Sequence, residues 1–142
     1  MTTETRVLRP DRELDALAAE KLLGYVWITF GLQGGWFRVL RPDTPHSRDI
    51  GGYDAGLEPP RSGWWDASVP KCTESMDAAM LLVEALRAMG LFVMMSASPG
   101  KPWVVRFSRL TVIHDYTDAS LPRAVTVAAI LAAGGNPYQE AL

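Results

Sequence analysis

The chain has 142 residues, a formal net charge of −2 and a single cysteine. This length fits one domain, and a composition with 48% apolar and 21% charged residues excludes a disordered chain. The weakly acidic balance disfavours general nucleic-acid binding, which needs a basic field to neutralise phosphates. We find no signal peptide and no apolar stretch long enough to cross a bilayer. One cysteine also excludes an internal disulfide, so the sequence predicts a protein of the reducing cytoplasm.

The first expected element is a helix over residues 12–23, which follows a flexible tail of residues 1–9. Pro10-Asp11 offers an N-cap for this helix, and Gly24 is a suitable residue to end it. Between these limits the apolar residues recur at helical spacing: Leu14, Leu17, Ala18 and Leu22.

A β-hairpin and a long connection follow. Tyr25–Phe30 is rich in β-branched and aromatic residues, and Trp36–Leu40 is expected to return as the second strand after a glycine-rich turn. Residues 41–71 then lack any periodicity and hold five of the ten prolines. Connections inside a domain usually have about 4–6 residues, and much longer ones are commonly functional or disordered. Because disordered segments are poor in aromatics, Tyr53 and Trp64-Trp65 favour an ordered loop.

Two strongly apolar helices are expected in the second half. One begins with Thr73 as its N-cap and ends near Met89. The other is capped by Asp118 or Ser120 and ends at Ala133. Apolar residues cover more of both helices than one sheet face can bury, and large exposed apolar patches usually mark interfaces. The sequence therefore predicts a closed, symmetric homo-oligomer.

Two strands are expected between these helices, Leu91–Ala97 and Trp103–Ile113, joined by a turn at residues 98–102. The second strand alternates apolar and polar residues, which gives it one apolar face. The full order is helix, hairpin, long loop, helix, hairpin, helix. This order predicts a single α+β domain over residues 10–135, in which helices pack on an antiparallel sheet, and a C-terminal tail over residues 136–142.

Four stretches resemble a known family: Leu14–Lys21 followed by Gly24, Val69–Thr73 before an alanine-rich helix, the strand entry Gly90–Val93, and the Ala/Leu-rich helix from Leu121. They are similar to the phage ABA-sandwich domain family. The chain departs from it at Cys72, where the family commonly has an aromatic residue. The resemblance implies an α-β-α sandwich encoded by a phage or prophage. It implies no particular activity and so supplies no functional residues.

No catalytic residue, metal site or cofactor is predicted. Cys72 precedes a helix and could form a nucleophilic site with His114 and Asp115, but no sequence signature links the three residues. His46 and His114 lack the close spacing of metal ligands. The glycine pairs at residues 34–35 and 51–52 lack the spacing of a phosphate-binding loop and are expected to be turns.

The segment 61–73 is the best candidate for a binding site. Trp64 or Trp65 could stack on a base. Arg61 and Lys71 could meet phosphates, and Thr73 stands where free N–H groups of a helix N-terminus attract anions. These residues together predict a site for a small, phosphate-bearing ligand. The alternative is that both tryptophans close the core beneath a long loop.

Three functions from different classes remain open. The first is a phage-encoded counter-defence protein that sequesters a nucleotide-derived immune signal in the host cytoplasm without chemistry; this step is an analogy from the implied phage setting. The second is an interaction module that blocks a host protein. The third is a small thiol- or metal-assisted hydrolase. The sequence favours them in that order.

Overall fold

The structure, a computed structural model, describes residues 6–32, 35–45, 52–54 and 65–139. It is an α+β fold with three main helices and two antiparallel sheets, which confirms the fold class and agrees broadly with the expected element order. The helices are α1 (Asp11–Leu22), α3 (Met76–Ala88) and α4 (Leu121–Ala132). The strands are β1 (Tyr25–Leu32), β2 (Gly35–Pro42), β3 (Gly52–Asp54), β4 (Phe92–Ser96), β5 (Trp103–Arg109) and β6 (Val112–Asp118).

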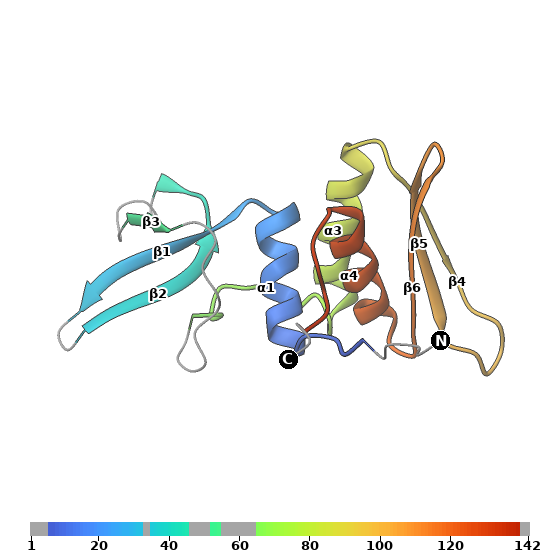
Figure 1. Ribbon diagram of the computed structural model, residues 1–142, viewed down its shortest axis with the longest axis horizontal. Helices are drawn as coiled ribbons and strands as arrows, with labels where there is room; N and C mark the ends of the chain where they lie inside the picture. Colours follow the sequence, from blue (N-terminus) through green and yellow to red (C-terminus); the bar gives the residue numbers. More distant parts are fainter. Residues whose placement is uncertain (1–5, 33–34, 46–51, 55–64, 140–142) are drawn as a thin grey trace.

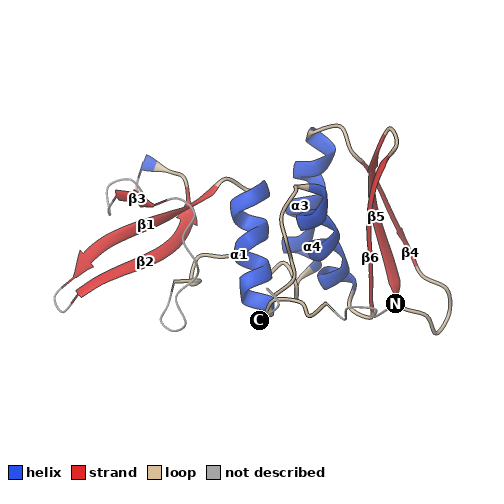
Figure 2. Cartoon of the chain, in the orientation of Figure 1, coloured by secondary structure: helices blue, strands red, loops and turns tan. Residues whose placement is uncertain are grey.

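The helices form a block between the two sheets (Figures 1 and 2). The first sheet has the strand order β2-β1-β3, and the second has the order β4-β5-β6. The helices α3 and α4 cover one face of the second sheet, and α1 packs on their other side (Figure 1). The strands thus belong to two sheets, whereas the sequence led us to expect helices packed on one sheet.

The first hairpin matches its prediction, and the long connection contains a short strand. β1 and β2 pair from Tyr25 opposite Pro42 to Leu32 opposite Gly35. The strand β3, within the expected loop over residues 41–71, pairs with the other edge of β1. A turn was expected at the glycine pair 34–35, and of these two residues Gly35 instead begins β2.

The second sheet contains a turn that the sequence analysis missed. Residues 103–113 were expected to form one strand, but they divide between β5 and β6, with Arg109 opposite Val112. The chain reverses at Leu110-Thr111, and Leu110 takes a φ of +54°. This conformation is unfavourable for residues other than glycine. Without glycine, asparagine or proline at the turn, the sequence carries no ordinary turn signal.

The helix ends correct two expected caps. α3 begins at Met76, where the Ser75 side chain accepts a hydrogen bond from the Ala78 N–H at 3.3 Å. Thr73 is therefore not its N-cap. α1 begins at Asp11 without a side-chain cap. In α4, Ser120 is the cap and accepts from the Arg123 N–H, as one of the two expected alternatives.

The main core explains why α4 is so apolar. The residues from Ala124 to Ile130 are all buried, because α1, α3 and the second sheet surround this helix. Its apolar circumference is covered within the chain, so α4 no longer argues for an oligomer. α3 differs, since it leaves Met80 and Leu81 substantially exposed, as is Met89 at its C-cap.

The two expected tails are partly ordered against each other. Leu8 forms an isolated antiparallel bridge with Tyr138. The Arg9 N–H donates to the Pro137 carbonyl at 2.9 Å, and the Gln139 N–H donates to the Val7 carbonyl at 2.7 Å. Residues 6–9 and 136–139 are therefore part of the fold. Among the described helices, none has the length and apolarity that a membrane crossing requires.

Candidate functional site

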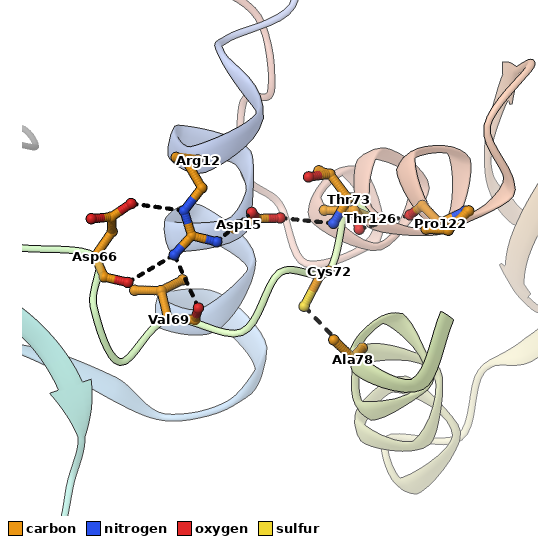
Figure 3. Close-up of polar contacts among 9 residues, drawn as sticks. All are labelled: Arg12, Asp15, Asp66, Val69, Cys72, Thr73, Ala78, Pro122 and Thr126. Carbon is orange, nitrogen blue, oxygen red and sulfur yellow. Dashed lines mark hydrogen bonds and ion pairs between the residues drawn. The ribbon is translucent and has the colours of Figure 1, made fainter. Parts of the chain in front are cut away.

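The expected ligand segment is tied to α1 by a buried carboxylate (Figure 3). Asp15 is completely buried on the face of α1 that meets residues 65–73. Its Oδ1 accepts a hydrogen bond from the Thr73 N–H at 2.8 Å, and its Oδ2 accepts one from Arg12 at 2.8 Å. The N–H group that was expected to attract a phosphate thus already binds an anion, and that anion belongs to the protein.

Arg12 extends this network along the segment (Figure 3). Its guanidinium donates to the Asp66 carboxylate at 2.7 Å, to the Asp66 carbonyl at 2.7 Å and to the Val69 carbonyl at 3.0 Å. Hydrogen bonds that involve an ionised group are stronger than neutral ones. Together, Arg12 and Asp15 fix the backbone from residue 66 to residue 73 against α1.

Burial decides the charge behaviour of Asp15. Removing the carboxylate from water raises its pKa above the usual value, and the hydrogen bond from Thr73 and the charge of Arg12 offset this effect only in part. The ionised form is therefore disfavoured relative to a solvated aspartate, although two donors surround it. Such an arrangement holds a structure together and offers no free group to a substrate.

The described residues of the expected ligand site differ in their exposure and surroundings. Trp65 is 8% exposed and packs on Trp27 with ring centroids 5.6 Å apart. Thr73 is buried, while Lys71 is exposed. Arg61 and Trp64 lie outside the described residues. For Trp65 the structure thus supports the alternative, a tryptophan that closes the core.

Trp65 belongs to a small second core that joins α1 to the first sheet. The indole N–H of its neighbour Trp27 donates to the Glu20 carboxylate on α1 at 2.6 Å. The Leu40 N–H of β2 donates to the Trp65 carbonyl at 3.0 Å. The Trp65 ring is buried in this cluster, so the structure shows it as part of the core. The apolar residues of β1 and β2 are the sequence signal that could have indicated this core role of Trp65.

Cys72 is not assembled with a base. Its side chain is completely buried, and its Sγ donates to the Ala78 carbonyl at 3.6 Å. Burial raises the pKa of the thiol to about 12, so the reactive thiolate is disfavoured. His114 and Asp115 lie on β6, and α3 and α4 separate that sheet from the segment that carries Cys72 (Figures 1 and 3).

Metal ligands do not gather in the part of the chain that the structure describes. Within residues 6–32, 35–45, 52–54 and 65–139, no three histidine, cysteine, aspartate or glutamate side chains are close enough to hold an ion. His46 and the expected turn at Gly51 lie outside these residues, and the adjacent Gly52 begins β3.

One face of the second sheet is not covered by any described helix, and we call it the outer face. It is the side of β4-β5-β6 that points away from α3 and α4 (Figure 1). The register places Phe92, Ser108 and Ile113 in one row across this face. Phe92 is 74% exposed and Ile113 is 55% exposed. Exposed aromatic and branched side chains on an uncovered sheet face are unusual for a surface with no partner.

The next row on the outer face places charges beside an apolar side chain. Met94 is 50% exposed and lies opposite Arg106, which lies opposite Asp115 on the next strand. Arg106 and Asp115 form an ion pair at 3.3 Å, and both side chains remain substantially exposed. The outer face therefore combines three exposed apolar side chains with an exposed pair of opposite charges.

Leu110 extends this apolar surface at the turn between β5 and β6. Its side chain is 94% exposed and its backbone lies in the left-handed region. A non-glycine residue in this region costs about 1–2 kcal/mol. Neither the exposure of the Leu110 side chain nor its backbone conformation stabilises the folded chain. This combination points to a role outside the fold itself.

Comparisons with protein-family models, with curated proteins and with solved structures find no match to this chain. The resemblance to the phage ABA-sandwich family therefore stays a prediction, and function has to be inferred from the geometry alone.

Proposed function

We propose that this protein is a non-catalytic interaction module that binds a partner protein through the outer face of β4-β5-β6. The observation that carries the proposal is the row of Phe92 and Ile113, with Met94 beside it, all at least half exposed on one sheet face. This was the second of the three functions that the sequence left open. In the phage setting implied by the sequence resemblance, the partner is a host protein.

The composition of the outer face fits a protein partner. Aromatic residues, methionine and arginine are enriched in the energetic centres of protein interfaces. Phe92, Met94 and Arg106 supply all three types within two neighbouring rows. A sheet face is broad and open, and such a surface favours a large partner over a small ligand, which is usually enclosed in a concave site. The fitting partner carries an apolar patch with polar groups for Arg106 and Asp115.

The chemistry of the buried groups supports a role without catalysis. Arg12, Asp15 and Cys72 are the groups with the most altered environments around the expected site, and each is engaged with the protein itself. Sequestration of a phosphate-bearing signal stays a prediction, because it now depends on Arg61, Trp64 and the exposed Lys71.

The test begins with capture of a partner by the immobilised full chain from a bacterial lysate. The captured protein is identified, purified and titrated against two variants. One variant replaces Phe92, Met94 and Ile113 with serine. Its matched control replaces Val7 with serine, because this side chain near the N-terminus is also more than half exposed, at 57%, and lies on neither the outer face nor α3.

The outer-face variant should bind at least roughly thirtyfold more weakly, because loss of one central anchor typically costs about 2 kcal/mol or more. The Val7→Ser control should bind like the wild type. Equal affinity of the wild type and the outer-face variant would contradict the proposal. Purified protein that retains material absorbing at nucleotide wavelengths, with no captured protein, would favour the sequestration hypothesis instead.

A further inference from the structure

The second sheet ends in an edge strand that lacks the usual protection. β4 is hydrogen-bonded only to β5 in the described chain, so one side of its backbone is free of sheet partners. Its five residues Phe92–Ser96 contain no charged residue and no proline. Natural proteins commonly protect such edges with charges, proline or bulges, because a bare edge pairs with other chains.

The opposite edge of the same sheet is different. β6 carries Asp115 and Asp118, so two β6 edges brought together would place acidic side chains near one another. Like charges across paired strands are destabilising. The charge distribution therefore favours pairing through β4 and disfavours it through β6.

We propose that the protein forms a two-fold symmetric dimer in which β4 pairs with β4 of a second copy, giving a continuous six-stranded antiparallel sheet. The two-fold axis of such a dimer is perpendicular to the sheet, so the two β4 strands run antiparallel and the helices of both copies lie on the same side of the sheet. The register that keeps all five residues paired places Met94 opposite Met94 of the second copy. It also places Phe92 opposite Ser96, and Val93 opposite Met95, across the axis.

This register joins like surfaces on both faces of the sheet. Val93 and Met95 are partly buried and pack on the main core. Their cross-axis pairing extends that core from one copy into the other. On the outer face, the exposed Phe92 and Met94 of both copies form one longer apolar surface. Hydrophobic side chains that are half exposed in one chain thus gain neighbours in the dimer.

The helix layer supports the same assembly. α3 contacts β4, whereas α4 lies over β5 and β6, so α3 is the helix nearest the free edge. α3 is also the helix that leaves Met80 and Leu81 exposed, at 38% and 49%, with Met89 at its C-cap exposed at 54%. In the joined sheet, the two α3 helices become neighbours on the inner face. Their apolar side chains then have a surface to pack on, which a single chain does not provide.

The self-association predicted from the sequence is thus assigned to a specific surface. The sequence predicted self-association through the apolar helices, but α4 is covered inside the chain. The edge of β4 and the exposed side of α3 are the surfaces that remain for self-association. The dimer does not depend on the proposed partner, since it uses the strand edge and can be measured on the protein alone.

The test compares the mass in solution of the full wild-type chain with two lysine variants. Sedimentation at micromolar concentration should give twice the chain mass of 15.6 kDa for the wild type. Met94→Lys places like charges opposite each other at the axis and should weaken the dimer by roughly tenfold or more. Ile113→Lys is the matched control, because Ile113 is on the same outer face with nearly equal exposure, 55% against 50%. It should remain dimeric.

A cross-link keeps the test valid if a lysine variant folds poorly. Cα atoms directly opposite in an antiparallel pair are about 4.5–5.5 Å apart, which lies within the range of about 4.4–6.8 Å that a disulfide spans. Met94→Cys should therefore form a covalent dimer on mild oxidation, while Ile113→Cys should not. Monomeric wild type, a Met94→Lys protein that dimerises like the wild type, or loss of the dimer in both lysine variants would each overturn the proposal. The last result would indicate face-to-face packing instead.

Discussion

The buried carboxylate of Asp15 allows a sharp test of the network in Figure 3. Two substitutions separate its two tasks, which are to accept the Thr73 N–H and to carry a negative charge beside Arg12. Asp15→Ala removes both. Asp15→Asn removes the charge but keeps a carbonyl oxygen that can accept the hydrogen bond from Thr73.

The magnitude follows from what each variant leaves without a partner. Asp15→Ala leaves the buried Thr73 N–H unpaired, which costs about 1–3 kcal/mol. Arg12 loses one partner, but it keeps three hydrogen bonds to Asp66 and Val69 and is 29% exposed, so its loss adds about 1 kcal/mol. We expect Asp15→Ala to lower the free energy of unfolding by about 2–4 kcal/mol. Asp15→Asn should lower it by about 1 kcal/mol or less.

The pH dependence gives a second readout with a defined sign. The pKa of Asp15 in the folded chain lies above its ordinary value of 3.8 because of burial. The folded state therefore holds the proton more tightly than the unfolded state does. The Asp15 contribution to stability is complete below the unfolded pKa and falls as pH rises through the folded pKa. Asp15→Asn cannot titrate there, so the advantage of the wild type over Asp15→Asn should shrink from acid towards neutral pH.

Urea unfolding, followed by tryptophan fluorescence and circular dichroism at several pH values, measures both effects. Equal slopes with denaturant in all three proteins would show that the comparison is sound. Two outcomes would refute the reasoning. The first is an Asp15→Ala protein no less stable than Asp15→Asn within about 0.5 kcal/mol. The second is a wild-type advantage that grows as the pH rises.

Three further outcomes follow from single side chains. The Cys72 thiol should resist labelling in the native protein at mildly alkaline pH and react fully after denaturation, because burial raises its pKa to about 12; rapid native labelling would contradict this. Trp65→Ala should cost about 3–5 kcal/mol in urea unfolding, as expected for a core tryptophan, and a loss below about 1 kcal/mol would mean that the ring lies free. Leu110→Gly should leave the melting temperature unchanged or higher, since relief of the positive φ gains about 1–2 kcal/mol against about 0.5–1 kcal/mol for the flexibility of glycine. A clear fall in melting temperature would show that the Leu110 side chain is needed for folding.

Local signals in the sequence were sufficient for the helices and the first hairpin. Gly24, Gly90 and Gly134 follow the three helices and all have positive φ, the conformation for which glycine is suited. The apolar spacing of α1 and the β-branched run of β1 are likewise properties of neighbouring residues. These local preferences match the folded elements because tertiary contacts do not override them here.

The outer face was missed because of one turn. In an unbroken strand over residues 103–113, alternation would place Ile113 on the same face as Val105 and Phe107, which are buried under the helices. The turn at Leu110-Thr111 reverses the chain, so that Ile113 lies opposite Ser108 on the outer face. A leucine at this position gives no turn signal, and the exposed apolar surface could not be recognised without the turn.

Two residues of the expected ligand site have surroundings that the sequence did not reveal. Thr73 and Trp65 were assessed from their sequence neighbours, but their partners Asp15 and Trp27 belong to α1 and β1. The sequence marks Asp15 as an ordinary polar residue of an amphipathic helix. Only the packing of α1 on the segment shows that this position is buried and that its carboxylate faces the Thr73 N–H.

The buried network and the bare strand edge together restrict where this protein can act. Arg12 and Asp15 direct their hydrogen bonds to the chain itself and fix the segment from Asp66 to Thr73 against α1. An ordered surface lowers the entropic cost of binding a partner. In the described chain, the second sheet offers two such surfaces, which are the exposed apolar side chains of the outer face and the free backbone edge of β4. Binding to other proteins, including a second copy of this one, is the activity that such a distribution favours.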